Sequence, residues 1–271
     1  MHGNEALPEY LMESDEETLR LDLKTDVRLV EKQARWAGIK PGMRIADLGC
    51  GSGKTTSVLY HLTQPGGSAI GVDISKKRID YARENYLSEG VVFTEGNILQ
   101  PLDHLGTFDF IWVRFVLEYY LANSFDIVEN ISKILKPGGI LCLIDLDNNC
   151  LNHHDLSERL KKTITATIDA LQKKANFDPY VGKKLYSFLY DLNYQDIDVD
   201  IAAHHLIWGE MKESDAFNWL KKVEVAPRKI NYPFDEYEGG YEEFREECKK
   251  FITDPRRFTY SPIICCRGVK P

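Results

Sequence analysis

The chain has 271 residues, of which 43% are hydrophobic and 28% charged, and its formal net charge at pH 7 is -8. This composition predicts a soluble globular protein with a sizeable core and excludes disordered and fibrous classes. The acidic balance argues against duplex nucleic acid as a partner, and the apolar runs are far shorter than the roughly 20 residues of a membrane span.

The first residues lack the basic and apolar regions of a secretory signal and are too acidic for a transit peptide. The six cysteines show no paired C-x-x-C spacing, which favours reduced, buried thiols over disulfides or metal ligands. We therefore expect a cytoplasmic protein with no metal site and no membrane segment.

The predicted elements begin with one amphipathic helix from Leu19 to Ala37, preceded by a capping box at Ser14 and Glu17 and ended by Gly38. Short strands and helices then alternate. The expected ranges are strands at 43–48, 68–74, 91–94, 108–113 and 140–144, and helices at 54–62, 76–87 and 125–135. Such alternation is typical of a parallel sheet with helices on both faces.

The alternation breaks after residue 147. A Lys-rich helix over 151–175 and an aromatic, acidic block over 207–256 are interpreted as two insertions. Between them, Asp178-Pro179 is expected to start a helix, and a strand is expected over 196–206. A last strand is expected over 258–267.

Two strand ends carry residues that suggest a ligand. The first strand runs into a loop with glycines at 49, 51 and 53, which let the backbone turn sharply and approach a ligand closely. The second strand ends near Asp73, close to the roughly 20-residue spacing at which doubly wound folds place a carboxylate for ribose hydroxyls. Together they predict a nucleoside site; a purely structural turn with a helix cap is the alternative.

The glycine loop departs from two phosphate-binding patterns. A dinucleotide fingerprint requires glycine where Lys54 stands, and a P-loop ending in Gly53-Lys54-Thr55 requires glycine where Leu48 stands. The strand ending in Asp145 does resemble the one that holds magnesium in P-loop proteins. A P-loop-like NTPase therefore remains an alternative.

Five segments occur in a characteristic order: ADLGCGSG from Ala46, GVDIS from Gly71, EGNI from Glu95, FDFIWVRFVLEY from Phe108 and LKPGGIL from Leu135. They resemble the motifs of the class I S-adenosylmethionine-dependent methyltransferases, in particular the small-molecule branch resembling the quinone-biosynthesis enzymes. The resemblance covers about 43–145 and continues more faintly over 178–192. It implies an α/β, doubly wound, Rossmann-like sheet of seven strands, mostly parallel with an antiparallel last strand.

The resemblance also implies a domain organisation. An N-terminal helical segment over 1–42 could fold over the cofactor, and the cofactor-binding core covers 43–150. A helical cap insertion covers 151–177, a core helix and strand cover 178–206, a second cap insertion covers 207–256, and the final core strand covers 257–271.

Roles for single residues follow from the same resemblance. Gly49, Cys50 and Gly51 would pass beneath the methionine part of S-adenosylmethionine, with Asp47 organising the loop from the strand end.

The adenosine part would meet the next two strand ends. Asp73 would accept hydrogen bonds from the ribose hydroxyls, and Ile74 would pack on the adenine. Asn97, beside Ile98, would bond the adenine edge; the family often has Asp there, but an amide offers both donor and acceptor.

Three further residues each carry an open alternative. Arg114 would line the methionine end, or would pair with Glu118. Tyr10 and Arg20 resemble a segment that folds over the cofactor in related proteins, or belong to an ordinary surface helix.

The implied reaction is methyl transfer from S-adenosylmethionine to O, N or C of a small molecule, with S-adenosylhomocysteine as product. A sulfonium already activates its methyl, so alignment and exclusion of water can suffice, and no catalytic residue is assigned. The possible bases, for each of which a structural role is more common, are Asp145, Asp147, His153, His154, His204 and His205. Adjacent histidines on a strand are not expected to point into one pocket.

The substrate signals are mostly negative. No [ND]-P-P-[YF] motif follows the fourth strand, which disfavours DNA, and the acidic residues of 207–256 favour a neutral or cationic acceptor. A non-catalytic, S-adenosylmethionine-binding regulatory protein is a further alternative. The attacking atom and the oligomeric state are not predicted.

Overall fold

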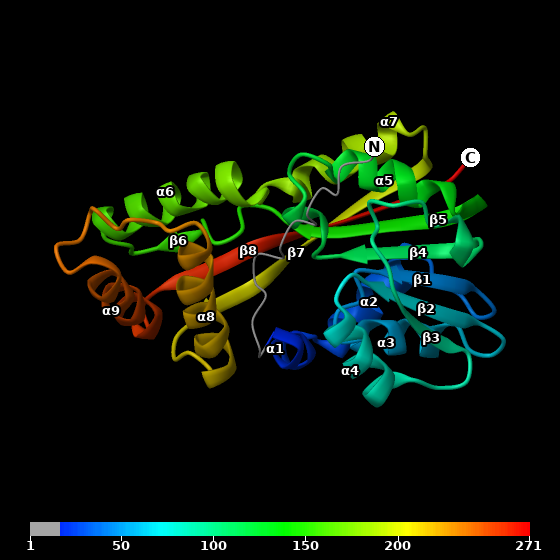
Figure 1. Ribbon diagram of the computed structural model, residues 1–271, viewed down its shortest axis with the longest axis horizontal. Coiled ribbons are helices and arrows are strands. Elements are labelled where there is room, and N and C mark those ends of the chain that lie inside the picture. Colours follow the sequence, from blue (N-terminus) through cyan, green and yellow to red (C-terminus); the bar gives the residue numbers. More distant parts are fainter. Residues whose placement is uncertain (1–16) are drawn as a thin grey trace, which may run out of the picture.

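The computed structural model describes residues 17–271, in which one eight-stranded sheet forms the centre of the molecule (Figure 1). The strands are β1 (Arg44–Leu48), β2 (Ser68–Asp73), β3 (Val91–Glu95), β4 (Phe108–Arg114), β5 (Leu135–Leu146), β6 (His153–His154), β7 (Gln195–Trp208) and β8 (Phe258–Val269). Their order is β3-β2-β1-β4-β5-β8-β6, and β7 also pairs with β8. β1 to β5 are parallel and β8 is antiparallel to its neighbours.

The α/β fold and the antiparallel last strand are thus confirmed, and the two-residue β6 is an addition. Because β1, β2 and β4 are parallel neighbours, with Leu48 opposite Val72 and Asp47 opposite Trp112, their carboxyl ends meet at one edge of the sheet. Ligands of open α/β sheets bind outside this edge.

Helices cover both faces of the sheet. Apolar residues of α2 (Val27–Ala37), α3 (Lys54–Leu62) and α4 (Lys76–Tyr86) pack on one face. Those of α5 (Ser124–Lys133) and α7 (Leu185–Asp191), the latter after a short 3-10 turn at Val181–Lys184, pack on the other. The fully buried Trp112 and Ile111 alternate between these two cores, as neighbours on a strand must.

The expected N-terminal helix is two helices, α1 (Glu17–Lys24) and α2. Asp26 interrupts the run because its side chain accepts hydrogen bonds from the backbone N–H groups of Arg28 and Leu29, which caps α2. Gly38 ends α2 with φ of +100°, as predicted. Ser14 lies outside the described residues.

The expected helix over 151–175 is also shorter. β6 comes first, and α6 (Glu158–Ala175) begins after Ser157, whose hydroxyl accepts from the N–H of Leu160.

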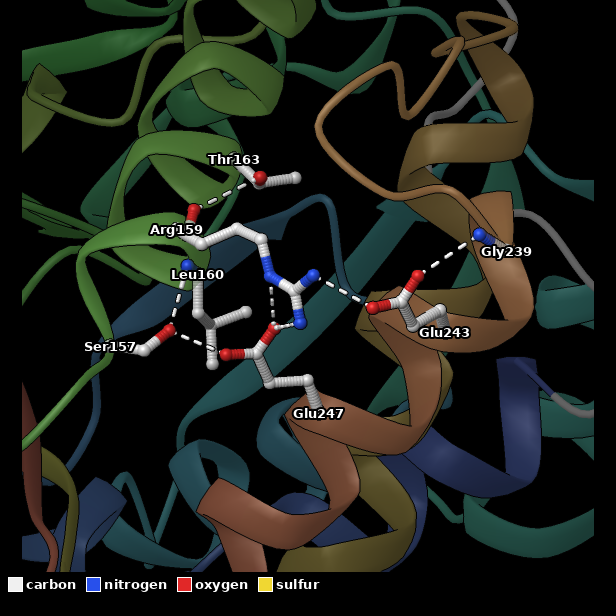
Figure 2. A network of polar contacts seen from close by, with 7 residues as sticks. All are labelled: Ser157, Arg159, Leu160, Thr163, Gly239, Glu243 and Glu247. Atoms are coloured by element: carbon white, nitrogen blue, oxygen red, sulfur yellow. Dashed lines mark hydrogen bonds and ion pairs between the residues drawn. The ribbon is translucent and has the colours of Figure 1, made fainter.

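α6 packs with α8 (Glu213–Lys229) and α9 (Gly240–Thr253) at one end of the molecule, beside the extended ends of β7 and β8 (Figure 1). Arg159 joins two of these helices: its guanidinium donates to Glu243 Oε1 at 2.7 Å and to Glu247 Oε2 at 3.0 Å (Figure 2). Glu243 also accepts a hydrogen bond from the N–H of Gly239, the residue before α9, so the same carboxylate contacts both Arg159 and the start of α9. We call α6, α8 and α9 the cap.

None of the helices formed by residues 17–271 combines the length and the apolar character needed to cross a bilayer.

Candidate functional site

The carboxyl ends of β1 and β2 are bonded to each other. The N–H of Gly51, in the loop after β1, donates to Asp73 Oδ2 at 2.9 Å. Gly49 has φ of +82°, and a Cβ there would lie 2.3 Å from Cγ2 of Val116, so the loop requires glycine at this position. The predicted glycine turn and the predicted carboxylate therefore meet.

A cavity of about 430 Å³ opens above these two strand ends, within the size range of small-molecule sites. We call it the first cavity. Its lining comes from α1, the glycine loop, the ends of β2, β3 and β4, the segment after β4, and single residues of α3, α4 and α6: Leu21, Lys24, Thr25, Gly49, Cys50, Gly51, Ser52, Thr55, Val72, Asp73, Ile74, Ser75, Arg78, Gly96, Ile98, Arg114, Phe115, Val116, Tyr119, Tyr120 and Ala175.

Asp73 is buried, yet its carboxylate is well supported. Oδ1 accepts from the N–H of Ser75 and from Arg78 Nε, both at 2.9 Å, while Oδ2 bonds Gly51. A carboxylate has about four lone-pair positions, so this one retains capacity for a ligand hydroxyl.

Arg114 lies at the end of β4 and lines the same cavity. Its guanidinium stacks 4.1 Å from the ring centroid of Phe115, and its Nε is buried with no hydrogen-bond partner in the described chain. Burial lowers the pKa of Arg114 to about 10, so it is charged at neutral pH. The alternative pair with Glu118 does not form among the described residues; Glu118 accepts instead from Asn149 Nδ2 at 2.7 Å.

Phe115 itself has φ of +57°, an uncommon conformation for a bulky residue. The turn places its ring between Arg114, the Lys24 amine at 4.9 Å and the His204 ring at 5.0 Å. Strained residues of this kind are concentrated at functional sites.

Seven of the predicted residues line the first cavity: Gly49, Cys50, Gly51, Asp73, Ile74, Ile98 and Arg114. Asp47 is buried just beneath the loop, where it accepts from Thr56 Oγ1 at 2.6 Å, and burial raises its pKa to about 7. Asn97 does not line the cavity, and its Oδ1 accepts from the N–H of Leu99. The Asp47 and Asn97 roles stay predictions.

The remaining two predicted contacts are placed elsewhere or not described. Arg20 lines a different cavity and pairs with Glu17 at 2.6 Å, whereas Leu21 and Lys24 of the same helix line the first cavity. Tyr10 lies outside the described residues.

A second cavity, of about 110 Å³, lies between the core and the cap. Lys24 and Tyr119 line both cavities, so the two adjoin at these residues. The other lining residues come from α1, the core and all three cap helices: Arg20, Glu118, Leu146, Asn149, Cys150, Ile164, Thr167, Ile168, Leu171, Phe177, Trp219, Lys222, Val223, Ala226, Pro227 and Phe244.

The histidine pair of β7 differs from the expectation. The rings of His204 and His205 are not on opposite faces but 4.0 Å apart, because the register shifts between His204 and Ile207 and His205 has φ of +49°. Burial, followed by the charge of Lys24, keeps the pKa of His204 well below its usual value. The pair is neutral at neutral pH and lies between Phe115 and Trp219, which line the two cavities.

Two other possible bases, His153 and Asp145, have structural partners. His153 bonds Thr259 Oγ1 and the carbonyl of Cys150, both at 2.9 Å. Asp145 is fully buried and accepts from the N–H groups of Glu118 and Leu146. Burial and the charge of Glu118 raise the pKa of Asp145 well above its usual value.

Lys24, Arg78 and Phe115 line the first cavity but were not among the predicted residues. Arg78 could have been found, since it lies one helical turn after the Ser75 cap that follows Asp73 and so faces the carboxylate. Lys24 lies four residues after Arg20 on the same helix face. No local pattern indicates the left-handed turn at Phe115.

Comparisons with known proteins agree with this fold. A demethylmenaquinone methyltransferase from Lactococcus lactis is 30% identical over 119 residues, which are 41% of this chain and 46% of that protein. An uncharacterized methyltransferase from a Synechocystis strain is 32% identical over 117 residues, 40% of this chain and 49% of that one. The chain thus spans about half the length of the curated relatives it matches.

Solved structures share the fold over most of the chain. The YcgJ protein of Bacillus subtilis has a TM-score of 0.58 at 16% identity and covers 90% of this chain and 99% of its own. The [4+2]-cyclase SpnF has a TM-score of 0.53 at 16% identity and covers 90% of this chain and 84% of its own. One fold therefore serves different chemistries.

A family model described as a methyltransferase domain matches residues 39–193, more than half of the chain. This range contains β1 to β5, the glycine loop, Asp73 and Arg114. The chain belongs to this methyltransferase-domain family.

Proposed function

We propose that the chain binds S-adenosylmethionine in the first cavity and methylates a small molecule held in the second. The observation that carries the proposal is the grouping of Asp73, the glycine loop and Arg114 on the wall of one cavity that adjoins another. Family membership supports methyl transfer, and the adjoining second cavity provides a place for an acceptor.

The residues of the first cavity fit the donor. Arg114 is a cation without a carboxylate partner in the described chain, and the amino-acid part of the donor carries a carboxylate that a guanidinium can bind with two hydrogen bonds. Asp73 has acceptor capacity for ribose hydroxyls. Ile74 and Ile98 offer apolar surface for a purine.

The donor supplies a methyl group that an acceptor atom attacks while the carbon–sulfur bond breaks and its electron pair stays on sulfur. The chain then has to align the two molecules and exclude water. Tyr119 and Lys24, which line both cavities, lie where acceptor and donor would meet. The candidate bases are His204, whose ring lies 5.0 Å from that of Phe115 in the first cavity, and Glu118, which lines the second cavity.

The two alternatives have less support. Lys54, the residue that would contact phosphates in a P-loop, donates instead to the carbonyl of Asp22 on α1 at 2.8 Å. A purely regulatory protein would not need the second cavity. A cytoplasmic location is part of the proposal and is supported by the six free cysteines.

Calorimetry tests the donor site. We expect the protein to bind S-adenosylhomocysteine and not magnesium-ATP, and Arg114→Met to weaken this binding. Arg28→Met, on the exposed side of α2, is the matched control and should bind like the native protein. Binding of ATP alone would contradict the proposal, and transfer of labelled methyl from S-adenosylmethionine to small-molecule acceptors tests the activity itself.

A further inference from the structure

The second cavity combines an apolar body with cationic groups. Its walls include Ile168, Leu171, Phe177 and Phe244, while three cations, Arg20, Lys24 and Lys222, line it against one carboxylate, Glu118, in the described chain. Buried cations without countercharge are costly, so such an arrangement favours an anionic ligand.

The three cations are not equivalent. Arg20 is neutralised by Glu17 in a buried pair. Lys222 lies 3.6 Å from the thiol of Cys150 and 5.2 Å from the ring centroid of Trp219, neither of which is a carboxylate. Lys24 lies over Phe115. Within residues 17–271 neither lysine has an ion-pair partner.

Two buried polar groups reinforce this interpretation. Thr167 and Trp219 line the cavity and are each 7% exposed, and Thr167 Oγ1 and Trp219 Nε1 have no hydrogen-bond partner in the described chain. Both groups can donate, and leaving a buried donor without a partner is unfavourable, a cost that an acceptor atom of the ligand would remove. They come from α6 and α8, so the two cap helices contribute one donor each.

We propose that the second cavity binds a small carboxylic acid as its carboxylate, with Lys222 as the cation and Lys24, Thr167 and Trp219 as hydrogen-bond donors. This inference rests on the proposed function, because it names the class of acceptor. The lining explains the choice of a monoanion, because it includes two lysines without an ion-pair partner in the described chain and one carboxylate, Glu118. The volume of about 110 Å³ limits the enclosed part to a small group.

The acidic residues of the cap do not oppose this assignment. Glu242 and Glu246 of α9 are exposed and do not line the cavity. A bound acceptor contacts the residues that line the cavity and not those of the outer surface. The basic lining therefore favours an anionic acceptor, in place of the neutral or cationic acceptor that the acidic residues of 207–256 led us to expect.

The test uses the full chain saturated with S-adenosylhomocysteine and titrated with benzoate, with its neutral isostere benzamide and with phenyl phosphate. We expect benzoate to bind roughly tenfold tighter than benzamide, since one charge-assisted contact is worth about 1.4 kcal/mol or more. Lys222→Met should abolish this preference, while Lys222→Arg should retain it because the charge is kept. Lys221→Met is the matched control, since Lys221 is adjacent on α8, pairs with Glu224 and does not line the cavity.

Equal binding of benzoate and benzamide, no binding of benzoate, or an unchanged preference in Lys222→Met would each overturn the inference. Tighter binding of phenyl phosphate than of benzoate would overturn the monoanion assignment. Failure to bind S-adenosylhomocysteine would instead overturn the proposed function, so the two failures can be told apart.

Discussion

Replacement of Asp73 by Asn tests the bond between the two strand ends. The amide cannot accept at both positions: wherever its NH₂ group points, it faces the N–H of Gly51 or the donors of Ser75 and Arg78. At least one charge-assisted hydrogen bond is lost, at about 1.5–3 kcal/mol, and the buried ion pair with Arg78 at 2.9 Å is lost as well.

We therefore expect Asp73→Asn to lower the free energy of unfolding by about 3 kcal/mol. For a chain of this size that corresponds to a fall in Tm of roughly 6 to 12 °C. If Asp73 also holds the ribose, binding of S-adenosylhomocysteine should weaken by about 2 to 3 kcal/mol, which is roughly 30- to 150-fold. Thermal unfolding and calorimetry measure the two effects separately.

Asp80→Asn is the matched control, because Asp80 is 43% exposed on α4, the helix that carries Arg78, and its pairs with Lys76 and Arg83 lie at the surface. It should change stability by less than about 1 kcal/mol and leave ligand binding unchanged. A variant of Asp73 that is destabilised but binds normally would refute the ribose role. A variant that is as stable as the native protein would refute the structural reasoning.

Three further predictions concern other parts of the molecule. Gly53→Ala should lower the free energy of unfolding, measured in urea, by about 2–4 kcal/mol, because φ is +86° and the new Cβ would lie 2.6 Å from Cβ of Ala82. Gly138→Ala is the control, since Gly138 also has a positive φ but has open space around it, and this variant should lose clearly less stability. Equal losses of stability in the two variants would contradict the predicted clash. Burial, followed by the charges of neighbouring cations, lowers the pKa of Lys24 from 10.5 to about 7 in the folded chain. Between pH 7 and pH 10.5 the unfolded chain therefore binds one proton more than the folded chain, and the stability of the native protein relative to Lys24→Met should rise with pH across this window. A stability difference that does not change with pH would exclude the lowered pKa. Arg159→Ala removes both ion pairs to α9, so amide hydrogen exchange of α9 should accelerate. Exchange of α5, which serves as the control, should stay unchanged. Unaltered exchange in α9 would show that these ion pairs do not hold the cap together.

Much of the core could be predicted because its signals are local. The end of α2 at Gly38 and the bounds of α3 each depend on residues within a few positions of each other. The meeting of Gly51 and Asp73 follows almost as directly, because parallel neighbouring strands end at the same edge. The break at Asp26 was missed because apolar periodicity continues through it, and only the side-chain cap separates the two helices.

The histidine pair shows a different limit. A regular strand places consecutive side chains on opposite faces, and that rule fails where β7 is bulged and His205 takes a positive φ. Nothing in the residues around 204–207 requires the bulge. It depends on how β7 pairs with β8, whose partner residues are more than 50 positions away in the chain.

The second cavity could not be predicted from local sequence patterns. Lys24 on α1 and Lys222 on α8 line the same cavity only when the cap is folded against the core. The family match ends at residue 193 and so includes α6 but not Trp219 or Lys222. Membership therefore bears mainly on the donor side of the site, because Lys24, Trp219 and Lys222 of the acceptor side lie outside the match. The specificity of this chain should accordingly depend in large part on residues outside the match, among them Lys24 and Lys222.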